Sequence, residues 1–494
     1  MKLKDLAAAI PVAGMLGNRE TEITDIVTST SLVGEGCCFI CVKGFRTDGH
    51  AFAAEAAEKG ASAIVMDNEN FYRNFAEKHK AALKAGTLAL ILTDSSRHAV
   101  AMLSDKFWGH PSGELRLTGV TGTKGKTTTS LMIKKIMDTA GRRTGLVGTM
   151  YNMIGREIIP TERTTPEANV LQPLLRRMAD SGVSDCVMEV SSQGLKLERV
   201  GGCVYGTCVF TNLSRDHIGE TEHPDMEDYA ASKAKLFRMC ENGVFNADSD
   251  WFERISRDAS CRIYTYGIDR DADFRAEDIV YGSDCVDYEL CWPLGRFHVH
   301  VRIPGKFSVY NSLAAAAVCI LEGITPETVA EGLKDIVVKG KAEIVPTGRD
   351  FTVMIDYAHN PDSFINIITT AKAFAKRVVF LFGAGGDRNR PRALMGETAA
   401  SCADFTIITS DNPRTEDPAK IVADIEEGAR KTGRPYICIV DRKQAICYAI
   451  SNAKPGDVII LAGKGHETTQ ILKDRVIPFD EREVVKEALQ ALGK

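Results

Sequence analysis

The sequence predicts an α/β protein in which parallel sheets are covered by helices. Short β-branched runs, such as residues 377–383 and 457–463, alternate with longer helical patterns along almost the whole chain. With 494 residues the chain is too long for one hydrophobic core, so we expect about three domains. A Gly- and Thr-rich loop at residues 121–129 separates a predicted strand from a predicted helix.

Composition narrows the class of protein. Hydrophobic residues make up 44% of the chain and charged residues 26%, which is ordinary for a globular enzyme. The net charge of −5 argues against nucleic acid as a partner. Because no run of about 18 apolar residues occurs, we expect no membrane insertion. Residues 1–16 contain an acid and a proline and are predicted to be an amphipathic helix rather than a signal peptide.

The 14 cysteines are scattered through apolar stretches, as is typical of reduced, buried thiols. We therefore expect a cytoplasmic protein. Cys38 and Cys41 form one C-x-x-C pattern, but they lie in an apolar segment without a second pair, so neither a metal nor a redox role is predicted for them.

A break in the pattern at residues 107–115 indicates a linker. Before this linker, the first block of the chain is predicted to form three buried strands with helices between them. The predicted strands are residues 38–44, 61–67 and 88–94, and the predicted helices are residues 51–60 and 74–86.

The second block begins with a strand at residues 115–120 and ends with a small-residue helix at residues 311–323. From about residue 260 its strands are predicted to be antiparallel. The strands expected in this block are residues 115–120, 186–190, 206–212, 262–267, 288–292 and 296–305. The third block shows the pattern most clearly, with strands at residues 351–357, 377–383, 404–410, 436–441 and 457–463.

Residues 121–129 have the setting of a phosphate-binding loop. Glycines let backbone N–H groups approach phosphates, Lys126 can reach the terminal phosphates, and Thr127 can ligate Mg²⁺. Val120 stands where the strict motif has glycine. We nevertheless predict binding of a nucleoside triphosphate, and the absence of an N-K-x-D motif argues against a GTPase. The loop residues assigned to it are Gly122, Thr123, Lys124, Gly125, Lys126, Thr127 and Thr128.

Polar residues cluster where the predicted strands end, which is the edge at which open parallel sheets bind ligands. Each has an ordinary alternative; Asp356, for example, could cap a helix. Glu189 and His217 are candidate Mg²⁺ ligands, although an isolated His217 would more often be structural. The strand-end residues are Glu189, Ser191, Ser192, Asp216, His217, Asp356, His359, Asp387, Arg388, Arg414, Lys464, His466 and Glu467.

Taken together, the motifs resemble the Mur ligase family. TGTKGKTTT, MEVSSQGL, FTNLSRDH, GKFSVYNSLAAA, MIDYAHNPDSF, SDNPRTED and AGKGHE follow one another in the family's order. The resemblance implies a three-domain architecture: residues 1–112 would bind the UDP part of the substrate, residues 113–338 would form a central P-loop ATPase domain, and residues 339–494 a Rossmann-like domain for the incoming amino acid.

The implied reaction is an amide ligation. ATP would phosphorylate the D-glutamyl carboxylate of UDP-MurNAc-L-Ala-D-Glu, and an amino acid amine would attack the acyl phosphate. ATP and Mg²⁺ are the implied cofactors. The implied catalytic residues are Lys126, Glu189, His217 and Lys233. Thr127, Glu189, His217 and Lys233 are the implied metal ligands, with Lys233 modified to a carbamate (N6-carboxylysine).

The resemblance also assigns substrate contacts. The nucleotide would further contact Asn311, Lys341, Asp356 and His359. The UDP-sugar-peptide would contact Thr30, Gly44, Asp48, Gly49, Thr164, Thr165, Ser191, Gln193 and Arg199. The chain departs from the family pattern at three places, where Gln193 replaces a histidine, Lys341 replaces an arginine, and Ser29, Thr30 and Ser31 replace the usual DSR.

Within the family, SDNPR and GKGHE favour meso-diaminopimelate as the amino acid. Arg414 can hold its distal carboxylate by two parallel hydrogen bonds, and Glu467 can accept the distal ammonium. The alternative is that Arg414 pairs with Glu416 or Asp417 on the surface. The residues implied to bind the amino acid are Arg388, Asp411, Asn412, Pro413, Arg414, Gly463 and Glu467.

Other functions stay open at this point. They are an L-lysine-adding ligase, a paralogue with a shifted acceptor, a folylpolyglutamate-synthase-like ligase, and a non-catalytic ATP-binding module. The expected partners are the small-molecule substrates, and the expected assembly state is a monomer.

Overall fold

The computed structural model describes residues 1–45, 47–219, 222–388 and 390–493. The chain divides into two compact units, which are described separately below. Unit 1 holds residues 1–275 and 313–329, and unit 2 holds residues 276–312 and 330–494. The predicted domain boundaries, near residues 112 and 338, stay a prediction.

The first sheet of unit 1 has the strand order β1-β5-β4-β3-β2, and every pair but β1–β5 is parallel. Its strands are β1 (Gly14–Gly17), β2 (Ile26–Val27), β3 (Cys38–Ile40), β4 (Ala63–Met66) and β5 (Ala89–Leu92). Its helices are α1 (Leu3–Ala7), α2 (Ala53–Glu58), α3 (Glu69–Lys78), α4 (Lys80–Ala85) and α5 (Ser96–Phe107), with 3₁₀ turns η1 (Thr30–Leu32) and η2 (Gly49–Phe52).

Both faces of this sheet are buried, which explains its continuous apolar strands. Cys38 and Ile40 pack in a cluster with α1 and α5, whereas Phe39 and Cys41 pack in a second cluster on the opposite face. Burial raises the pKa of both thiols, Cys38 and Cys41.

The expectation of one helix over residues 1–16 was wrong. Helix α1 ends at Ala7, and Gly14–Gly17 instead forms strand β1, antiparallel to β5. Pro11 lies between them, and proline both lacks an N–H and clashes with the preceding helical turn. Thr93 donates its hydroxyl to the Pro11 carbonyl oxygen at 2.8 Å, which ties this segment to the end of β5.

The larger sheet of unit 1 contains the order β13-β12-β11-β6-β10-β7-β8-β9. Its strands are β6 (Arg116–Thr121), β7 (Thr144–Val147), β8 (Asn152–Ile154), β9 (Glu157–Ile159), β10 (Asp185–Glu189), β11 (Tyr205–Phe210), β12 (Cys240–Asn246) and β13 (Arg262–Gly267). Its helices are α6 (Lys126–Thr139), α7 (Ala168–Asp180), α8 (Ser192–Lys196), α9 (Met226–Ala234) and α10 (Phe252–Ser256), with 3₁₀ turns η3 (Pro111–Glu114) and η4 (Lys235–Arg238).

Strand β13 corrects a second expectation. Residues 262–267 pair in parallel with β12, in the register Val244↔Tyr264, rather than antiparallel. The change to antiparallel pairing occurs later, in the hairpin of β15 (Val286–Trp292) and β16 (Gly295–Val301) within unit 2. Three elements cross the boundary between the units: β14 (Phe274–Tyr281), α11 (Lys306–Leu321) and α12 (Pro326–Lys334).

The main sheet of unit 2 has the order β17-β18-β22-β19-β20-β21. Its strands are β17 (Glu343–Val345), β18 (Thr352–Asp356), β19 (Arg377–Phe382), β20 (Phe405–Ile408), β21 (Tyr436–Cys438) and β22 (Asp457–Ala462), and a separate hairpin joins β23 (Thr469–Ile471) to β24 (Val476–Pro478). The five strands predicted for this region are present and pair in parallel.

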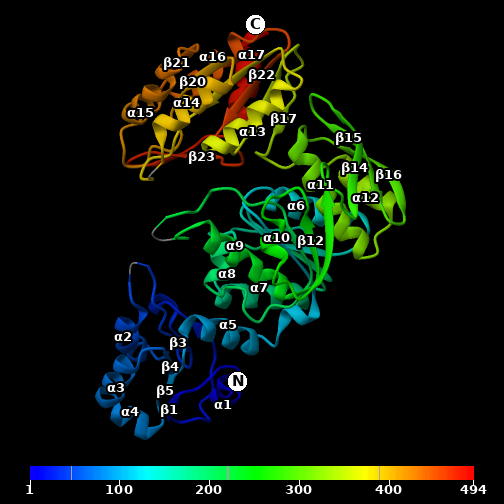
Figure 1. The fold of residues 1–494 in the computed structure, drawn as a ribbon. Helices are drawn as coiled ribbons and strands as arrows, with labels where there is room; N and C mark the ends of the chain where they lie inside the picture. Colours follow the sequence, from blue (N-terminus) through cyan, green and yellow to red (C-terminus); the bar gives the residue numbers. More distant parts are fainter. Residues whose placement is uncertain (46, 220–221, 389, 494) are drawn as a thin grey trace. The chain divides into compact units, whose positions relative to one another are not determined.

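Helices cover both faces of this sheet (Figure 1). They are α13 (Pro361–Lys372), α14 (Arg392–Cys402), α15 (Pro418–Lys431), α16 (Arg442–Ser451) and α17 (Glu481–Leu492). Val379 and Leu381 face α16 and α17, whereas the alternate residues Phe380 and Phe382 contact Phe364 of α13. Within the described ranges, no helix is long and apolar enough to cross a membrane.

Candidate active site

The phosphate-loop prediction falls between β6 and α6 in unit 1. Gly122 and Gly125 have φ values of 151° and 85°, a region that L side chains rarely adopt. A Cβ atom at Gly122 would lie 1.9 Å from the hydroxyl oxygen of Thr211, so only glycine fits there. The loop therefore turns sharply into helix α6, whose N-terminus favours anions.

Contacts with the end of β11 hold this loop in place. The backbone N–H of Lys124 donates to Asn212 Oδ1 at 3.0 Å, and Lys124 Nζ lies 3.2 Å from Asp216 Oδ2. Burial opposes ionisation of Asp216, but the charges of Lys124 and His217 outweigh it and lower the pKa of that carboxyl. The Nζ of Lys126 donates to the carbonyl oxygens of two loop residues, Gly122 at 2.8 Å and Thr123 at 3.1 Å.

Glu189, the last residue of β10, is buried beside the loop. It accepts hydrogen bonds from the Thr127 hydroxyl at 2.9 Å, the Thr149 N–H at 2.9 Å and the Thr149 hydroxyl at 2.8 Å. Thr149 follows β7 and belongs to no motif that the sequence singled out. The three donors keep a buried carboxylate in one orientation, with its oxygens next to the Thr127 hydroxyl.

Lys233 of helix α9 lies on the other side of Gly122. Its side chain is 1% exposed, its Nζ donates to the Gly122 carbonyl oxygen at 2.9 Å, and Nζ lies 4.5 Å from the centre of the Tyr229 ring. Burial, followed by the neighbouring charge of Lys126, lowers the pKa of Lys233 well below its ordinary value. A neutral amine at this position is nucleophilic.

His217 lies near this group, with its ring centre 6.0 Å from that of Tyr229. It lies on the loop after β11 with φ 57°, and its Nδ1 is 3.1 Å from Glu222 Oε1.

The residues predicted to hold the peptidyl sugar form a connected network around the end of β10. The Thr165 hydroxyl donates to the Glu189 carbonyl oxygen at 3.0 Å and accepts from the Ser191 N–H at 2.9 Å. Arg199, which forms an ion pair with Glu167, donates to the Thr165 carbonyl oxygen at 3.2 Å. Burial lowers the pKa of Arg199.

Two further members of that set lie close by. The Thr164 hydroxyl is 3.0 Å from the Thr149 hydroxyl. Gln193 lies in the first turn of α8, which Ser191 caps by accepting from the Gly194 N–H at 3.0 Å.

The residues predicted near the uridine diphosphate follow the ends of β2 and β3, which are neighbouring parallel strands. Thr30 begins η1, and Asp48 caps η2 by accepting from the His50 N–H at 3.0 Å. Gly44 donates to the Thr47 carbonyl oxygen and Gly49 to that of Val42. The structure therefore places these residues at one edge of the sheet.

In unit 2, three residues predicted to contact nucleotide surround the end of β18. Asp356 accepts from the N–H groups of Ala342 and Ala358, each at 2.7 Å. Lys341 Nζ lies 4.9 Å from the centre of the Tyr357 ring. His359 Nδ1 is 2.8 Å from the Tyr357 carbonyl oxygen. Asn311 is buried in helix α11.

A polar cavity of about 90 Å³ opens at the carboxyl ends of β18, β19, β20 and β22. It is lined by Tyr357, His359, Gly383, Ala384, Gly385, Arg388, Arg390, Met395, Asp411, Asn412, Arg414, Gly463 and Glu467. Six of the seven residues predicted to bind the amino acid thus lie around one cavity. The seventh, Pro413, belongs to the same turn.

One wall of the cavity is a fixed polar network. Asn412 donates its amide to Glu467 Oε2 at 2.8 Å, and buried Lys464 donates to both Asn412 Oδ1 and Glu467 Oε2 at 3.1 Å. Gly463 has φ 112°, and a Cβ atom there would lie 2.6 Å from Asp411 Oδ2. The glycine therefore allows the segment after β22 to lie close to the segment after β20.

Arg414 makes no surface ion pair of the kind considered from sequence. Glu416 instead accepts from Arg392 at 2.8 Å, and Asp417 caps helix α15. Arg414 has φ 51°, and its Nη1 donates to the Gly386 carbonyl oxygen at 2.8 Å. Among the residues that the structure describes, neither Arg414 nor Arg388 has a carboxylate partner.

The cavity also contains residues that sequence reasoning missed. Tyr357, Arg390 and Met395 line it. Arg390 donates to the His359 carbonyl oxygen at 2.6 Å. Its place two residues after Arg388 in the same loop was a signal that could have identified it.

Family models match most of the chain. The Mur ligase family catalytic domain matches residues 22–108, the Mur ligase middle domain residues 120–319, and the Mur ligase glutamate ligase domain residues 340–465. A protein of Caldanaerobacter subterraneus subsp. tengcongensis is 44% identical over 99% of both chains. The chain belongs to the Mur ligase family. It therefore has the family's three-domain α/β architecture, with a central P-loop domain and a C-terminal Rossmann-like domain.

The names of these Mur ligase relatives agree. The Caldanaerobacter protein and a Bacillus cereus protein, which is 42% identical over 99% of this chain and 98% of its own, are both named UDP-N-acetylmuramoyl-L-alanyl-D-glutamate–2,6-diaminopimelate ligase. A solved structure with the same name is 28% identical, with a TM-score of 0.72 over 100% of this chain and 99% of that one. A Mycobacterium tuberculosis folylpolyglutamate synthase complexed with ADP and AMPPCP, 17% identical with a TM-score of 0.61 over 74% of this chain and 92% of its own, shares the fold alone.

Proposed function

We propose that this protein is the ATP-dependent ligase that adds meso-diaminopimelate to UDP-N-acetylmuramoyl-L-alanyl-D-glutamate in peptidoglycan synthesis. The observation that carries the proposal is the cavity of unit 2, in which two arginines that have no carboxylate partner among the described residues face a fixed acid. Relatives that match almost the whole chain bear the name of this activity. The reaction class is an acid–amino-acid ligation.

In the first step, the D-glutamyl carboxylate oxygen attacks the γ-phosphorus of ATP, which gives an acyl phosphate and ADP. In the second step, the amine of diaminopimelate attacks the acyl carbon. Phosphate leaves, the amine loses a proton, and an amide forms. Such phosphoryl transfer depends mainly on positioning and charge neutralisation.

The phosphate loop would bind ATP, with its backbone N–H groups around the phosphates. Lys126, whose ammonium now donates to carbonyl oxygens of the loop, would turn to the terminal phosphates. We assign Asn311, Lys341, Asp356 and His359 to further contacts with the nucleotide. Lys341 keeps the positive charge of an arginine but offers a single donor centre.

Thr127 and Glu189 fit Mg²⁺, because they place a hydroxyl and a buried carboxylate 2.9 Å apart and Mg²⁺ prefers oxygen ligands. When bound, the ion would neutralise phosphate charge. The carbamate of Lys233 would add an anionic oxygen ligand. His217 is assigned to the same group: its Nδ1 contacts Glu222, and a histidine held in this way can still ligate a metal through Nε2.

Carbamate formation joins the neutral Lys233 amine to CO₂ and releases one proton. The burial and lowered pKa of this lysine support the assignment. Native mass spectrometry of the protein should show one bound CO₂, which Lys233→Ala lacks. The matched control is Lys235→Ala, because Lys235 follows on the same segment but is exposed. An unmodified wild-type protein that is fully active would exclude the carbamate.

The cavity of unit 2 would bind diaminopimelate, which carries two carboxylates and two ammonium groups. Arg414 would hold the distal carboxylate and Arg388 the other one, while Glu467 accepts the distal ammonium. Asp411, Asn412, Pro413 and Gly463 shape this site. L-Lysine lacks the distal carboxylate, so it would leave Arg414 without a partner.

The network of Thr164, Thr165, Ser191, Gln193 and Arg199 would hold the peptidyl sugar. Thr30, Gly44, Asp48 and Gly49 would lie near the uridine diphosphate. Their support is the shared strand edge on which each set lies, at the end of β10 and at the ends of β2 and β3 respectively.

We further infer a cytoplasmic monomer. ATP and a UDP-linked substrate are cytoplasmic metabolites, and the 14 cysteines, all of which lie in the described ranges, form no disulfide, as expected in a reducing compartment. Analytical ultracentrifugation tests the monomer, and a dimer at working concentration would contradict it.

The deciding experiment is phosphate release by the purified full-length protein with ATP, Mg²⁺ and UDP-MurNAc-L-Ala-D-Glu. Meso-diaminopimelate, L-lysine and no amino acid are compared. Turnover with diaminopimelate alone is the expected result. Turnover with lysine would keep the mechanism but overturn the assignment of Arg414. No turnover with either would indicate a paralogue with a different acceptor, and would direct attention to Gln193, Lys341 and residues 29–31.

A further inference from the structure

The hairpin of β15 and β16 in unit 2 has one face that the proposed reaction does not use. Side chains alternate along a strand, so every second residue shares a face. On one face Val286, Tyr288 and Leu290 are at most 1% exposed and pack into the core. The opposite face therefore presents the residues between and before them, which are Cys285, Asp287 and Glu289.

The partner strand adds two imidazoles to this outer face. In the antiparallel register, Asp287 lies opposite His300 and Glu289 lies opposite His298. Side chains that face one another across antiparallel strands lie within contact distance. The sequence patterns C-x-D-x-E and H-x-H thus meet on one surface, although neither is a recognised metal motif.

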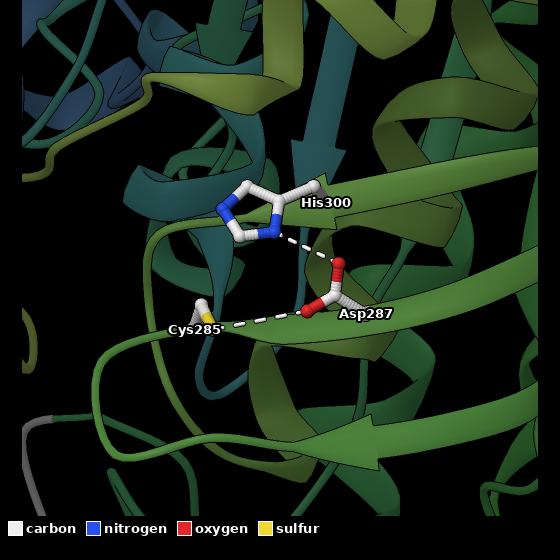
Figure 2. A group of neighbouring side chains, drawn as sticks. All are labelled: Cys285, Asp287 and His300. Atoms are coloured by element: carbon white, nitrogen blue, oxygen red, sulfur yellow. Dashed lines mark hydrogen bonds and ion pairs between the residues drawn. The ribbon is translucent and has the colours of Figure 1, made fainter.

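The distances among three of these groups are short (Figure 2). His300 Nδ1 lies 2.8 Å from Asp287 Oδ1, and Cys285 Sγ lies 3.8 Å from Asp287 Oδ2. The sulfur, the nitrogen and a carboxylate oxygen all lie within 4.8 Å of one another. All three side chains are partly buried. Figure 2 shows the thiol and the imidazole on either side of the carboxylate.

This donor set suits one class of metal. Zn²⁺ binds thiolate, imidazole and carboxylate at about 2.0–2.3 Å, and tetrahedral angles then place ligand atoms roughly 3.3–3.6 Å apart. The observed separations bracket that range, so small side-chain rotations would suffice. Sulfur and nitrogen ligands disfavour Mg²⁺ and Ca²⁺. A fourth ligand is also at hand, because His298 Nε2 lies 3.2 Å from Asp287 Oδ1.

We propose that Cys285, Asp287 and His300 form a binding site for a zinc-class transition metal, with His298 as the fourth ligand. The metal would join strands β15 and β16 outside the core and stabilise the hairpin. Binding releases the proton of the Cys285 thiol, and a neutral His300 that ligates through Nδ1 carries its proton on Nε2. No residue of this site belongs to the proposed active site, so the two proposals fail independently.

The alternative is a solvated polar face on which His300 and His298 pair with Asp287 and no metal binds. Cobalt distinguishes the two, because a thiolate bound to Co²⁺ gives a sulfur-to-metal absorption band. The reduced, chelator-treated full-length protein is titrated with Co²⁺. One equivalent should produce the band, and one equivalent of Zn²⁺ should abolish it.

Variants locate the site. Cys285→Ser should lose the band and bind Zn²⁺ at least about 10-fold more weakly, since even outer-shell substitutions can cost that much. The matched control is Cys291→Ser, because Cys291 shares the face of Asp287 on strand β15 but lies outside the cluster. That variant should keep the band. A wild-type protein without the band, or a Cys285→Ser variant that retains it, would overturn the proposal.

Thermal unfolding gives a second measurement that does not depend on cysteine. Zn²⁺ should raise the melting temperature of the wild type relative to chelator, since a ligand of the native state stabilises it. The rise should disappear in Asp287→Asn and in His300→Gln. An equal rise in these variants would place the metal elsewhere and overturn the site.

Discussion

The two candidate binding regions differ in how their charges are matched. Beside the phosphate loop, Glu189 accepts three hydrogen bonds and Lys126 donates to two carbonyl oxygens. In the cavity of unit 2, Glu467 is likewise held by Asn412 and Lys464. Arg414, however, has no carboxylate partner among the described residues.

This difference indicates that the two binding sites, the phosphate-loop region first and the cavity of unit 2 second, are organised differently before a ligand binds. The first region is pre-organised by backbone and buried side chains, so its chemistry should depend on single groups that cannot be replaced. The second presents positive charge that only a ligand neutralises, so its groups should determine selectivity more than rate.

The largest expected effect is at Lys126. Lys126→Ala removes the cation that the phosphate loop supplies, so phosphate release with diaminopimelate should fall on the order of 10³-fold. Lys135→Ala is the matched control, because Lys135 lies on the same helix and is exposed. A loss of less than ten-fold, measured at saturating ATP, would mean that the loop does not position phosphates.

The second prediction tests whether buried charged side chains also hold the cavity of unit 2 in place, as they do beside the phosphate loop. Arg442 and Glu481 are fully buried, and Arg442 also donates to the carbonyl oxygens of Ser410 and Ala462, which precede the cavity turns. Arg442→Met leaves the Glu481 charge unpaired and should cost about 3 kcal/mol of stability.

The double variant Arg442→Met/Glu481→Leu separates the buried charge from packing. It should recover much of the lost stability in thermal unfolding, because no unpaired charge remains. If the double variant is as unstable as the single one, the positioning of Ser410 and Ala462 matters more than the charge pair.

Arg414 gives the third effect, and here the comparison predicts a change in selectivity. Arg414→Ala should raise the KM for diaminopimelate roughly 10- to 100-fold while ATP affinity stays the same. Arg414→Lys should recover only part of this, because lysine lacks the two-pronged geometry. Arg430→Ala, an exposed arginine of α15 that pairs with Glu426, is the control. An unchanged KM would remove Arg414 from the site.

Sequence predicted the main sheet of unit 2 best, because its parallel strands are apolar runs, of which β18, β19, β20 and β22 are mostly buried. It failed where pairing depends on distant partners. Residues 262–267 have the same composition whether they pair with β12 or with a hairpin partner, and nothing local specifies the parallel register. The helix expected over residues 1–16 was limited by Pro11, whose effect the amphipathic pattern concealed.

For the candidate site, the strand-end rule alone assigns Arg388, Arg414 and Glu467 to one edge of the sheet, where they line the same cavity. The rule could not identify Thr149, because a threonine after a strand is ordinary and its importance comes from the buried carboxylate of Glu189 opposite it. Nor could it identify the partner of Arg414, since that partner is the backbone carbonyl oxygen of Gly386.

The smallest expected effect is a pH dependence of thermal stability that comes from one buried histidine of unit 1, His223. His223 is fully buried, with Nδ1 2.6 Å from Asp228 Oδ2 and Nε2 2.9 Å from Ser192 Oγ. Burial lowers the pKa of His223 below the ordinary 6.5; Asp228 opposes this shift, and the charge of Lys196 adds to it. The folded state therefore resists a proton that the unfolded state accepts.

The direction in which stability changes with pH follows from the linkage between folding and proton binding. The contribution of His223 is fully present above pH 6.5 and is lost as the pH falls below 6.5 toward the lowered folded pKa. The melting temperature should therefore decline as the pH falls from about 6.5 to 5.5, and His223→Gln should show a flatter profile. Equal slopes in the two proteins would mean that other groups control the acid response. The rigidity of the first region would then not depend on a neutral imidazole.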